Sequence, residues 1–157
     1  MDLNVIDNFF SETKHRSIHE YCLNAAYTYG ESDEDGLPVT GMVHEVNEFI
    51  YNLMDSTIRN RYNIKNMNVY RMYINCFAPC ERPYFHKDGD KGEVTFLYYP
   101  NMEWDKDDGG ETQFLTERDI LGVLPIPNRM VSFNADIWHR ATSFRNNHRF
   151  SLAVKYA

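Results

Sequence analysis

The sequence predicts a mainly β domain with two helices at its N-terminal side, in the form of a helix-supported β-sandwich or jelly roll. Two observations lead to this fold class. The apolar residues have helical spacing before Asn66 and alternate with a period of two after it. Short strand-like runs then follow one another, separated by Gly, Pro, Asn and Asp clusters. Because the chain has 157 residues and no repeat or strand–helix rhythm, we expect one domain, with 1–66 as helical support and 67–157 as the β core.

The helical half contains two amphipathic segments. Apolar positions spaced three and four apart predict a first helix from Ser11 to Tyr29, ended by Gly30. The acidic segment from Glu31 to Thr40 predicts a loop, which is either an ordinary acidic connection, the favoured interpretation, or an element near a site entrance. A second helix, ending before Asn63, is indicated by apolar residues on one face: Val46, Phe49, Ile50, Leu53, Met54 and Ile58.

The β half begins where alternation starts, at Val69. From there to Cys76, one set of residues alternates with another, as expected for a strand with two different faces. Six further runs predict strands: Tyr84 to Asp88, Glu93 to Tyr99, Glu111 to Leu115, Arg129 to Phe133, Trp138 to Thr142 and Arg149 to Tyr156.

Composition excludes several classes of protein. The net charge of −7 and a pI near 5.3 argue against a general nucleic-acid binder, which needs a basic surface. The N-terminal residues have no basic start and no long apolar run, so we expect no membrane span and a cytoplasmic location. Three cysteines are too few for a disulfide framework. Cys76 and Cys80 have a spacing that some zinc sites use, but further zinc ligands are lacking nearby, which favours buried free thiols.

The candidate metal ligands are His86, Asp88 and His139. Residues two apart on a strand point to the same side of a sheet, so His86 and Asp88 can offer an imidazole and a carboxylate to one ion. A distant histidine, His139, completes a set of two His and one carboxylate. This set is typical of non-haem Fe(II) oxygenases, because it leaves coordination positions open for substrate and dioxygen.

These residues, in this order, resemble a known family. The series of His86-x-Asp88, the segment 109–114 (GGETQF), His139 and Arg149 is similar to the 2-oxoglutarate and Fe(II)-dependent dioxygenases, prolyl 4-hydroxylase-like branch. The resemblance spans about Val69 to Tyr156, and implies a double-stranded β-helix, a cupin-like jelly roll.

The resemblance also implies roles. His86, Asp88 and His139 would hold Fe(II), and Arg149 would bind the distal carboxylate of 2-oxoglutarate, which suits a planar guanidinium. Tyr99 is the candidate for a hydroxyl that shares this task. Related halogenases carry a small residue in place of the carboxylate, so Asp88 disfavours halogenation.

The implied activity is hydroxylation of a C–H bond with release of succinate and CO2, using O2 and with ascorbate as a candidate accessory. A prolyl residue of a peptide or protein is the favoured substrate. A free amino acid or other small molecule is the alternative, and a non-catalytic cupin-type metal-binding domain is the non-enzyme reading. Nucleic-acid demethylation is disfavoured, because that branch carries a second Arg where this chain has Lys155. The acidic segment 101–108 is either a loop that covers the substrate or a solvated hairpin tip.

Overall fold

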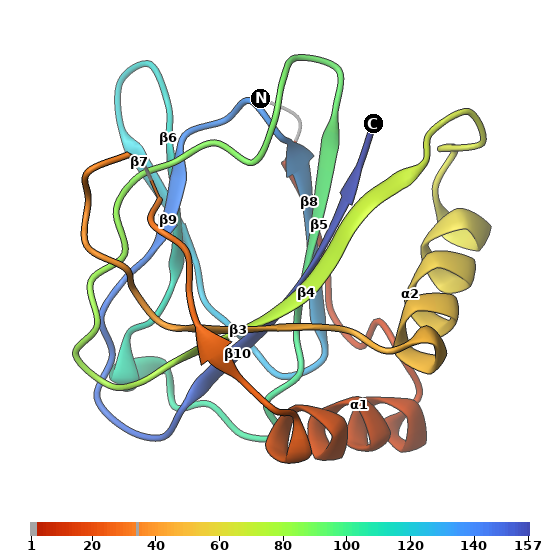
Figure 1. Cartoon of the computed structure of the whole chain (residues 1–157), viewed down its shortest axis with the longest axis horizontal. Helices are drawn as coiled ribbons and strands as arrows, with labels where there is room; N and C mark the ends of the chain where they lie inside the picture. The colour runs from red at the N-terminus through yellow and green to blue at the C-terminus, as the bar shows by residue number, and fades with distance from the viewer. Residues whose placement is uncertain (1–2, 34) are drawn as a thin grey trace.

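Two antiparallel β-sheets face each other, and two helices lie on the outer side of the larger sheet (Figure 1). The computed structural model describes residues 3–33 and 35–157; Met1, Asp2 and Glu34, which belong to the expected N-terminal segment and acidic loop, lie outside this range. The major sheet has the order β1-β8-β5-β10-β4-β3-β2, and the minor sheet has the order β7-β6-β9. This arrangement is the jelly roll that the sequence predicts.

The elements have the following bounds. In the major sheet they are β1 (Leu3–Ile6), β8 (Arg129–Asn134), β5 (Val94–Tyr99), β10 (Arg149–Tyr156), β4 (Val69–Phe77), β3 (Met42–Glu45) and β2 (Thr28–Tyr29). In the minor sheet they are β7 (Ile120–Val123), β6 (Thr112–Leu115) and β9 (His139–Ala141). The helices are α1 (Glu12–Asn24), α2 (Glu48–Arg61) and the short 3-10 helix η1 (Lys106–Asp108).

The period of two in β4, β5 and β10 separates the two faces of the major sheet. One face packs on the helices and forms the main core, in which Ile74, Tyr98 and Leu152 are fully buried beside Ile18 of α1 and Met54 of α2. The other face looks toward the minor sheet. The alternation expected from Val69 to Cys76 is confirmed from Arg71 onward, where Met72, Ile74 and Cys76 join the main core. A register shift opposite Lys155 and Tyr156 interrupts it, so Val69 packs on the same core instead of lying with Arg71.

The first helix is shorter than the sequence predicts. Ser11 caps its N-terminus, but the helix ends at Asn24, and Ala25 is already extended. The apolar spacing beyond Asn24 is misleading, because Thr28 and Tyr29 pair with β3 instead. The second helix agrees with expectation: Asn47 caps it, and it ends at Arg61.

The segment before residue 67, expected as helical support, contains strands beside its two helices, because β1, β2 and β3 all join the major sheet. Strand β7 was also not expected. The predicted strand from Tyr84 to Asp88 does not form; this segment has an isolated bridge between His86 and His139. None of the helices in the described ranges is long and apolar enough to span a membrane.

Candidate active site

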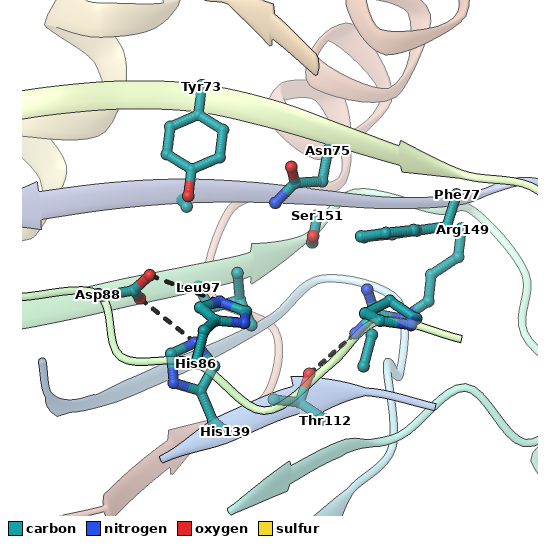
Figure 2. Close-up of a pocket in the computed structure, with 13 residues that line it drawn as sticks. Tyr73, Asn75, Phe77, His86, Asp88, Leu97, Thr112, His139, Arg149 and Ser151 are labelled. Atoms are coloured by element: carbon teal, nitrogen blue, oxygen red, sulfur yellow. Dashed lines mark hydrogen bonds and ion pairs between the residues drawn. The ribbon is translucent and has the colours of Figure 1, made fainter. Parts of the chain in front are cut away.

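The candidate site is a cavity between the two sheets (Figure 2). Its walls come from β4, β5 and β10 of the major sheet, from β6 and β9 of the minor sheet, and from the segment before β5. The lining residues are Tyr73, Asn75, Phe77, Pro83, His86, Asp88, Leu97, Thr112, His139, Ala141, Arg149, Ser151 and Ala153. In the view of Figure 2, the three predicted metal ligands gather at one side and Arg149 lies at the other, with Asn75 and Ser151 between them.

The structure brings His86, Asp88 and His139 together. One ligand atom from each lies within 4.8 Å of the others, and in the described part of the chain they form the one such group of three or more potential ligands. The Nε2 atom of His139 lies 3.4 Å from Oδ2 of Asp88, and Nε2 of His86 lies 3.8 Å from Oδ1. Two imidazole nitrogens and a carboxylate facing one point match the donor set of a non-haem iron site.

The backbone that places the ligands differs from the expected strand. His86 and His139 exchange two backbone hydrogen bonds of 2.9 Å, which holds their rings 4.5 Å apart. The chain then turns, and the N–H groups of Asp88 and Gly89 both donate to the carbonyl of Ala135. His86 and Asp88 therefore converge through a bridge followed by a turn.

Both histidines direct Nε2 toward the position that a metal ion would take, because Nδ1 of each ring is hydrogen-bonded to a backbone carbonyl oxygen. Nδ1 of His139 lies 3.0 Å from the carbonyl oxygen of Ile137, and Nδ1 of His86 lies 3.1 Å from the carbonyl oxygen of Tyr84. Donation from Nδ1–H leaves Nε2 as the atom with a free lone pair. Burial lowers the pKa of His139, more than Asp88 raises it, so this ring is neutral at pH 7, as a metal ligand must be.

Asp88 has a partner that sequence reasoning missed. The ammonium of Lys155 lies 2.7 Å from Oδ1 of Asp88, and the hydroxyl of Thr95 donates to Oδ2 at 2.8 Å. Burial raises the pKa of the Asp88 carboxyl, but His139 and Lys155 more than offset this and hold it below its usual value. Asp88 is therefore an anion, oriented by groups on two strands of the major sheet.

Arg149 lies at the opposite side of the cavity and is 1% exposed. Its Nε donates to the carbonyl of Gly110 at 2.8 Å, and Nη2 donates to the hydroxyl of Thr112 at 2.8 Å. Gly110 has φ +77°, and a Cβ there would lie 2.7 Å from Trp104, so this turn needs glycine. Within the described ranges no carboxylate lies at ion-pair distance from Arg149. A buried guanidinium with five donors and no protein anion is suited to an anionic ligand.

Tyr99 does not line the cavity. It is fully buried, its hydroxyl lies 2.7 Å from Oγ1 of Thr112, and its ring lies 5.3 Å from the guanidinium carbon of Arg149. Its contact with the cavity runs through Thr112. Tyr98, the neighbour of Tyr99 on β5, points to the opposite face, where its hydroxyl contacts His15. Tyr73, by contrast, is a wall of the cavity.

A second cavity of about 160 Å³ adjoins the first and shares five lining residues with it: Tyr73, Asn75, Phe77, His86 and Asp88. Its outer wall includes Glu31 and Asp33 of the acidic loop and Lys155. The loop that the sequence analysis favoured as an ordinary connection thus borders the site. Gly41 ends it with φ +67° against the ring of Phe77, so close that a Cβ would clash.

Other predicted features lie outside the cavities. No residue of 101–108 lines either one; Trp104 packs on Phe144 beyond Arg149. Cys22 and Cys76 are buried free thiols, but Cys80 is exposed, which corrects the expectation of a buried thiol. His148, which precedes Arg149 in the chain, is exposed and is not part of the metal group found among the described residues.

The fold is shared with three solved structures at low identity. A prolyl hydroxylase from Trichoplax adhaerens, in complex with a peptide of the hypoxia inducible factor oxygen degradation domain, is 17% identical (TM-score 0.73; 98% of this chain, 82% of that chain). A prolyl-4-hydroxylase from Pseudomonas putida is 14% identical (TM-score 0.77; 98% and 91%). HygX from Streptomyces hygroscopicus, with nickel, 2-oxoglutarate and hygromycin B bound, is 12% identical (TM-score 0.74; 99% and 82%).

No curated protein sequence matches the chain significantly. The model of the 2OG-Fe(II) oxygenase superfamily matches residues 67–156. This range holds all three candidate metal ligands and Arg149, and it is more than half of the chain. Iron(II) and 2-oxoglutarate are the cofactor and cosubstrate of this family, and the His-Asp-His group and the unpaired Arg149 have the chemistry to receive them. The chain belongs to the 2OG-Fe(II) oxygenase superfamily.

Proposed function

We propose that this protein is a 2-oxoglutarate- and Fe(II)-dependent hydroxylase in which His86, Asp88 and His139 hold the iron and Arg149 holds the cosubstrate. The single observation that carries the proposal is the pairing within one cavity of a His-Asp-His group and a buried guanidinium without a protein anion. A metal ligand set alone fits a non-catalytic cupin as well. The separate site for a carboxylate favours cosubstrate chemistry.

The residues divide the work between the two sides of the cavity. Iron held by His86, Asp88 and His139 would supply the oxidative decarboxylation of 2-oxoglutarate by dioxygen, in which one oxygen atom enters succinate as CO2 leaves and the other hydroxylates a C–H bond of the substrate. Neutral His139 and anionic Asp88 present lone pairs without a proton to displace. Arg149 and the hydroxyl of Thr112 receive the distal carboxylate, and the buried setting strengthens that charge-assisted pair.

We propose a prolyl residue of a peptide or protein as the substrate, entering through the cavity bordered by Tyr73 and Lys155. The support is the likeness to two prolyl hydroxylases, one of which holds a peptide. Hydroxylation of a small molecule is the second candidate, and the observation that favours it is the similar fold of HygX, which holds hygromycin B.

The test of the chemistry is succinate formation by the purified chain supplied with Fe(II), 2-oxoglutarate and ascorbate. We expect turnover in the wild type, even uncoupled from a substrate. His139→Ala is expected to lose at least about 100-fold in activity, since losing a ligand exceeds the 10–100-fold cost of losing a group that orients one. A wild type that neither forms succinate nor binds 2-oxoglutarate would overturn the proposal in favour of the non-catalytic cupin.

Arg149→Ala tests the cosubstrate site separately. Loss of one partner of a buried, hydrogen-bonded charge pair costs about 2–5 kcal/mol, so the 2-oxoglutarate requirement should rise roughly 30-fold or more. Metal affinity should stay close to that of the wild type, which distinguishes this variant from His139→Ala. Mass spectrometry for the gain of one oxygen atom, on proline-containing peptides and on small-molecule extracts in parallel, separates the two substrate classes.

A further inference from the structure

The two histidines of the metal group are held in different ways. Nδ1 of His139 has a backbone carbonyl behind it, that of Ile137. Nδ1 of His86 faces two acceptors: the carbonyl of Tyr84 at 3.1 Å and Oδ1 of Asp33 at 3.2 Å. Asp33 lies about fifty residues earlier in the chain, on the loop between β2 and β3.

Asp33 is placed firmly against this histidine. Its other oxygen, Oδ2, accepts a hydrogen bond of 2.8 Å from the backbone N–H of Tyr84, so the carboxylate spans the backbone and the ring of the same segment. The Asp33 side chain is 15% exposed and that of His86 is 24% exposed. The contact is therefore partly shielded from solvent, where electrostatic interactions are stronger than at an open surface.

The charge of Asp33 is not balanced by a close cationic side chain in the described ranges. No Lys or Arg there lies within ion-pair distance of Asp33, and the one titratable side chain at that distance is His86. Burying a carboxylate beside a neutral imidazole is unfavourable unless a positive charge is close. A dication on the far side of the ring, at Nε2, supplies that charge through the imidazole, which is the arrangement of a carboxylate–histidine–metal triad.

We infer that Asp33 is a positioning residue of the metal centre, which holds the His86 ring from its Nδ1 side and tunes the affinity for the ion. The inference rests on the proposed function, in that His86 is taken as a ligand. The carbonyl of Tyr84 can fix the tautomer without Asp33, so the particular contribution of Asp33 is its negative charge. The acidic loop is then part of the site, because the Asp33 carboxylate contacts a metal ligand, His86, without itself being a ligand.

The loop has a second anchor, which offers a matched control. Arg71 of β4 binds Glu31 through two hydrogen bonds, of 2.7 and 2.8 Å, and also binds Glu45. Glu31→Gln weakens the hold on the same loop without touching the Asp33–His86 contact. If Asp33 served only to tether the loop, both substitutions would have the same consequence for the metal site.

The experiment is titration of the full-length, metal-free chain with Co(II), followed by the visible absorption of the bound ion and by calorimetry. Asp33→Asn keeps the size of the side chain and removes its charge. We expect its Co(II) affinity to fall 10–100-fold, the usual cost of losing such a partner, with a shifted Co(II) spectrum. Glu31→Gln should stay within about twofold of the wild type, since it leaves the carboxylate–histidine contact in place.

The outcomes separate this inference from the proposed function. Equal Co(II) affinity and spectrum in the wild type and Asp33→Asn would overturn the role of Asp33 while leaving the metal site standing. An equal loss in Glu31→Gln and Asp33→Asn would also overturn it, because tethering would then explain both. If the wild type itself failed to bind Co(II), or if His139→Ala bound it as well as the wild type, the metal site and this inference would both fall.

Discussion

The two faces of the major sheet bury groups of different chemistry. Toward the helices, β10 presents Phe150, Leu152 and Val154, which pack into one apolar core. Toward the minor sheet, the alternating positions of the same strand are Arg149, Ser151, Ala153 and Lys155, all nearly inaccessible to solvent. A single strand thus alternates between packing and polar groups with a period of two.

The difference indicates that the face toward the helices serves mainly stability, whereas the face toward the minor sheet carries the groups of the candidate site. Apolar burial stabilises the chain by roughly 25 cal/mol per Å². Burial of charged groups is costly unless they are paired. Asp88 with Lys155 meets that condition, whereas Arg149 has no carboxylate at ion-pair distance among the described residues. A sheet face selected for stability alone would not carry these groups. The cavity face therefore combines an apolar cluster between the sheets, which includes Leu97, Phe114 and Phe133, with charged groups whose burial depends on a partner or a bound ligand.

The largest expected effect on the cavity face comes from Lys155→Met in the metal-free protein. Removing one partner of a buried ion pair costs about 3–5 kcal/mol, because the other charge is left buried and unpaired. Lys155 and Asp88 have side chains that are 11% and 4% exposed, so the pair qualifies as buried. Urea unfolding at neutral pH measures the loss, and Lys155→Arg, which keeps the cation, is the control.

The pH dependence of that loss has a definite sign. In the wild type, the lowered pKa of Asp88 makes its contribution to stability complete above the unfolded pKa of about 3.9, and acid removes it. In Lys155→Met the pKa of Asp88 rises, so protonation in acid relieves the unpaired charge. The gap between the stabilities of variant and wild type should therefore shrink as the pH is lowered, and a metal ion should stabilise the variant more than the wild type. A gap independent of pH would mean that Asp88 is not the partner that matters.

The matching change on the helix face is Leu152→Ala. Leu152 is fully buried in the main core, and such truncations cost about 2–5 kcal/mol through lost burial and a residual cavity. Succinate formation per folded molecule should stay unchanged, since the side chain points away from the site. Ser151→Ala, one residue before and on the cavity face, should cost less stability. Reversal of these two results would refute the division of the sheet into a structural and a chemical face.

The sequence predicted the division of the sheet into two faces well, but it did not predict the contacts between residues that are far apart in the chain. Alternation is local, so it identified the faces of most of β4, and the order of His86, Asp88, His139 and Arg149 was enough to predict which residues meet. The segment around His86 failed as a strand because backbone pairing depends on a distant partner. Here Ala135 takes two N–H groups of a turn.

The features missed by sequence reasoning are contacts between residues far apart in the chain. Lys155 was read only as the absence of an arginine, although it pairs with Asp88, and Asp33 was one acid among several in a loop. Strands as short as β2 and β3 have too few residues for a periodicity, and their conformation is set by the neighbours they join. A signal for Lys155 existed: a lysine at an inward position of a strand needs a buried partner.

The smallest effect is expected for Tyr99→Phe, which tests whether the Tyr99 hydroxyl contacts the cosubstrate directly or only through Thr112. Tyr99→Phe removes the hydroxyl bonded to Thr112 but leaves the bond between Thr112 and Arg149. One hydrogen bond contributes about 0.5–1.5 kcal/mol net, so the 2-oxoglutarate requirement should rise only roughly two- to tenfold. Thr112→Val, which removes a group lining the cavity and an acceptor of Arg149, should raise it further. If Tyr99→Phe instead matched Arg149→Ala, the Tyr99 hydroxyl would reach the cosubstrate itself, and the cavity face would extend one residue deeper than its lining residues indicate.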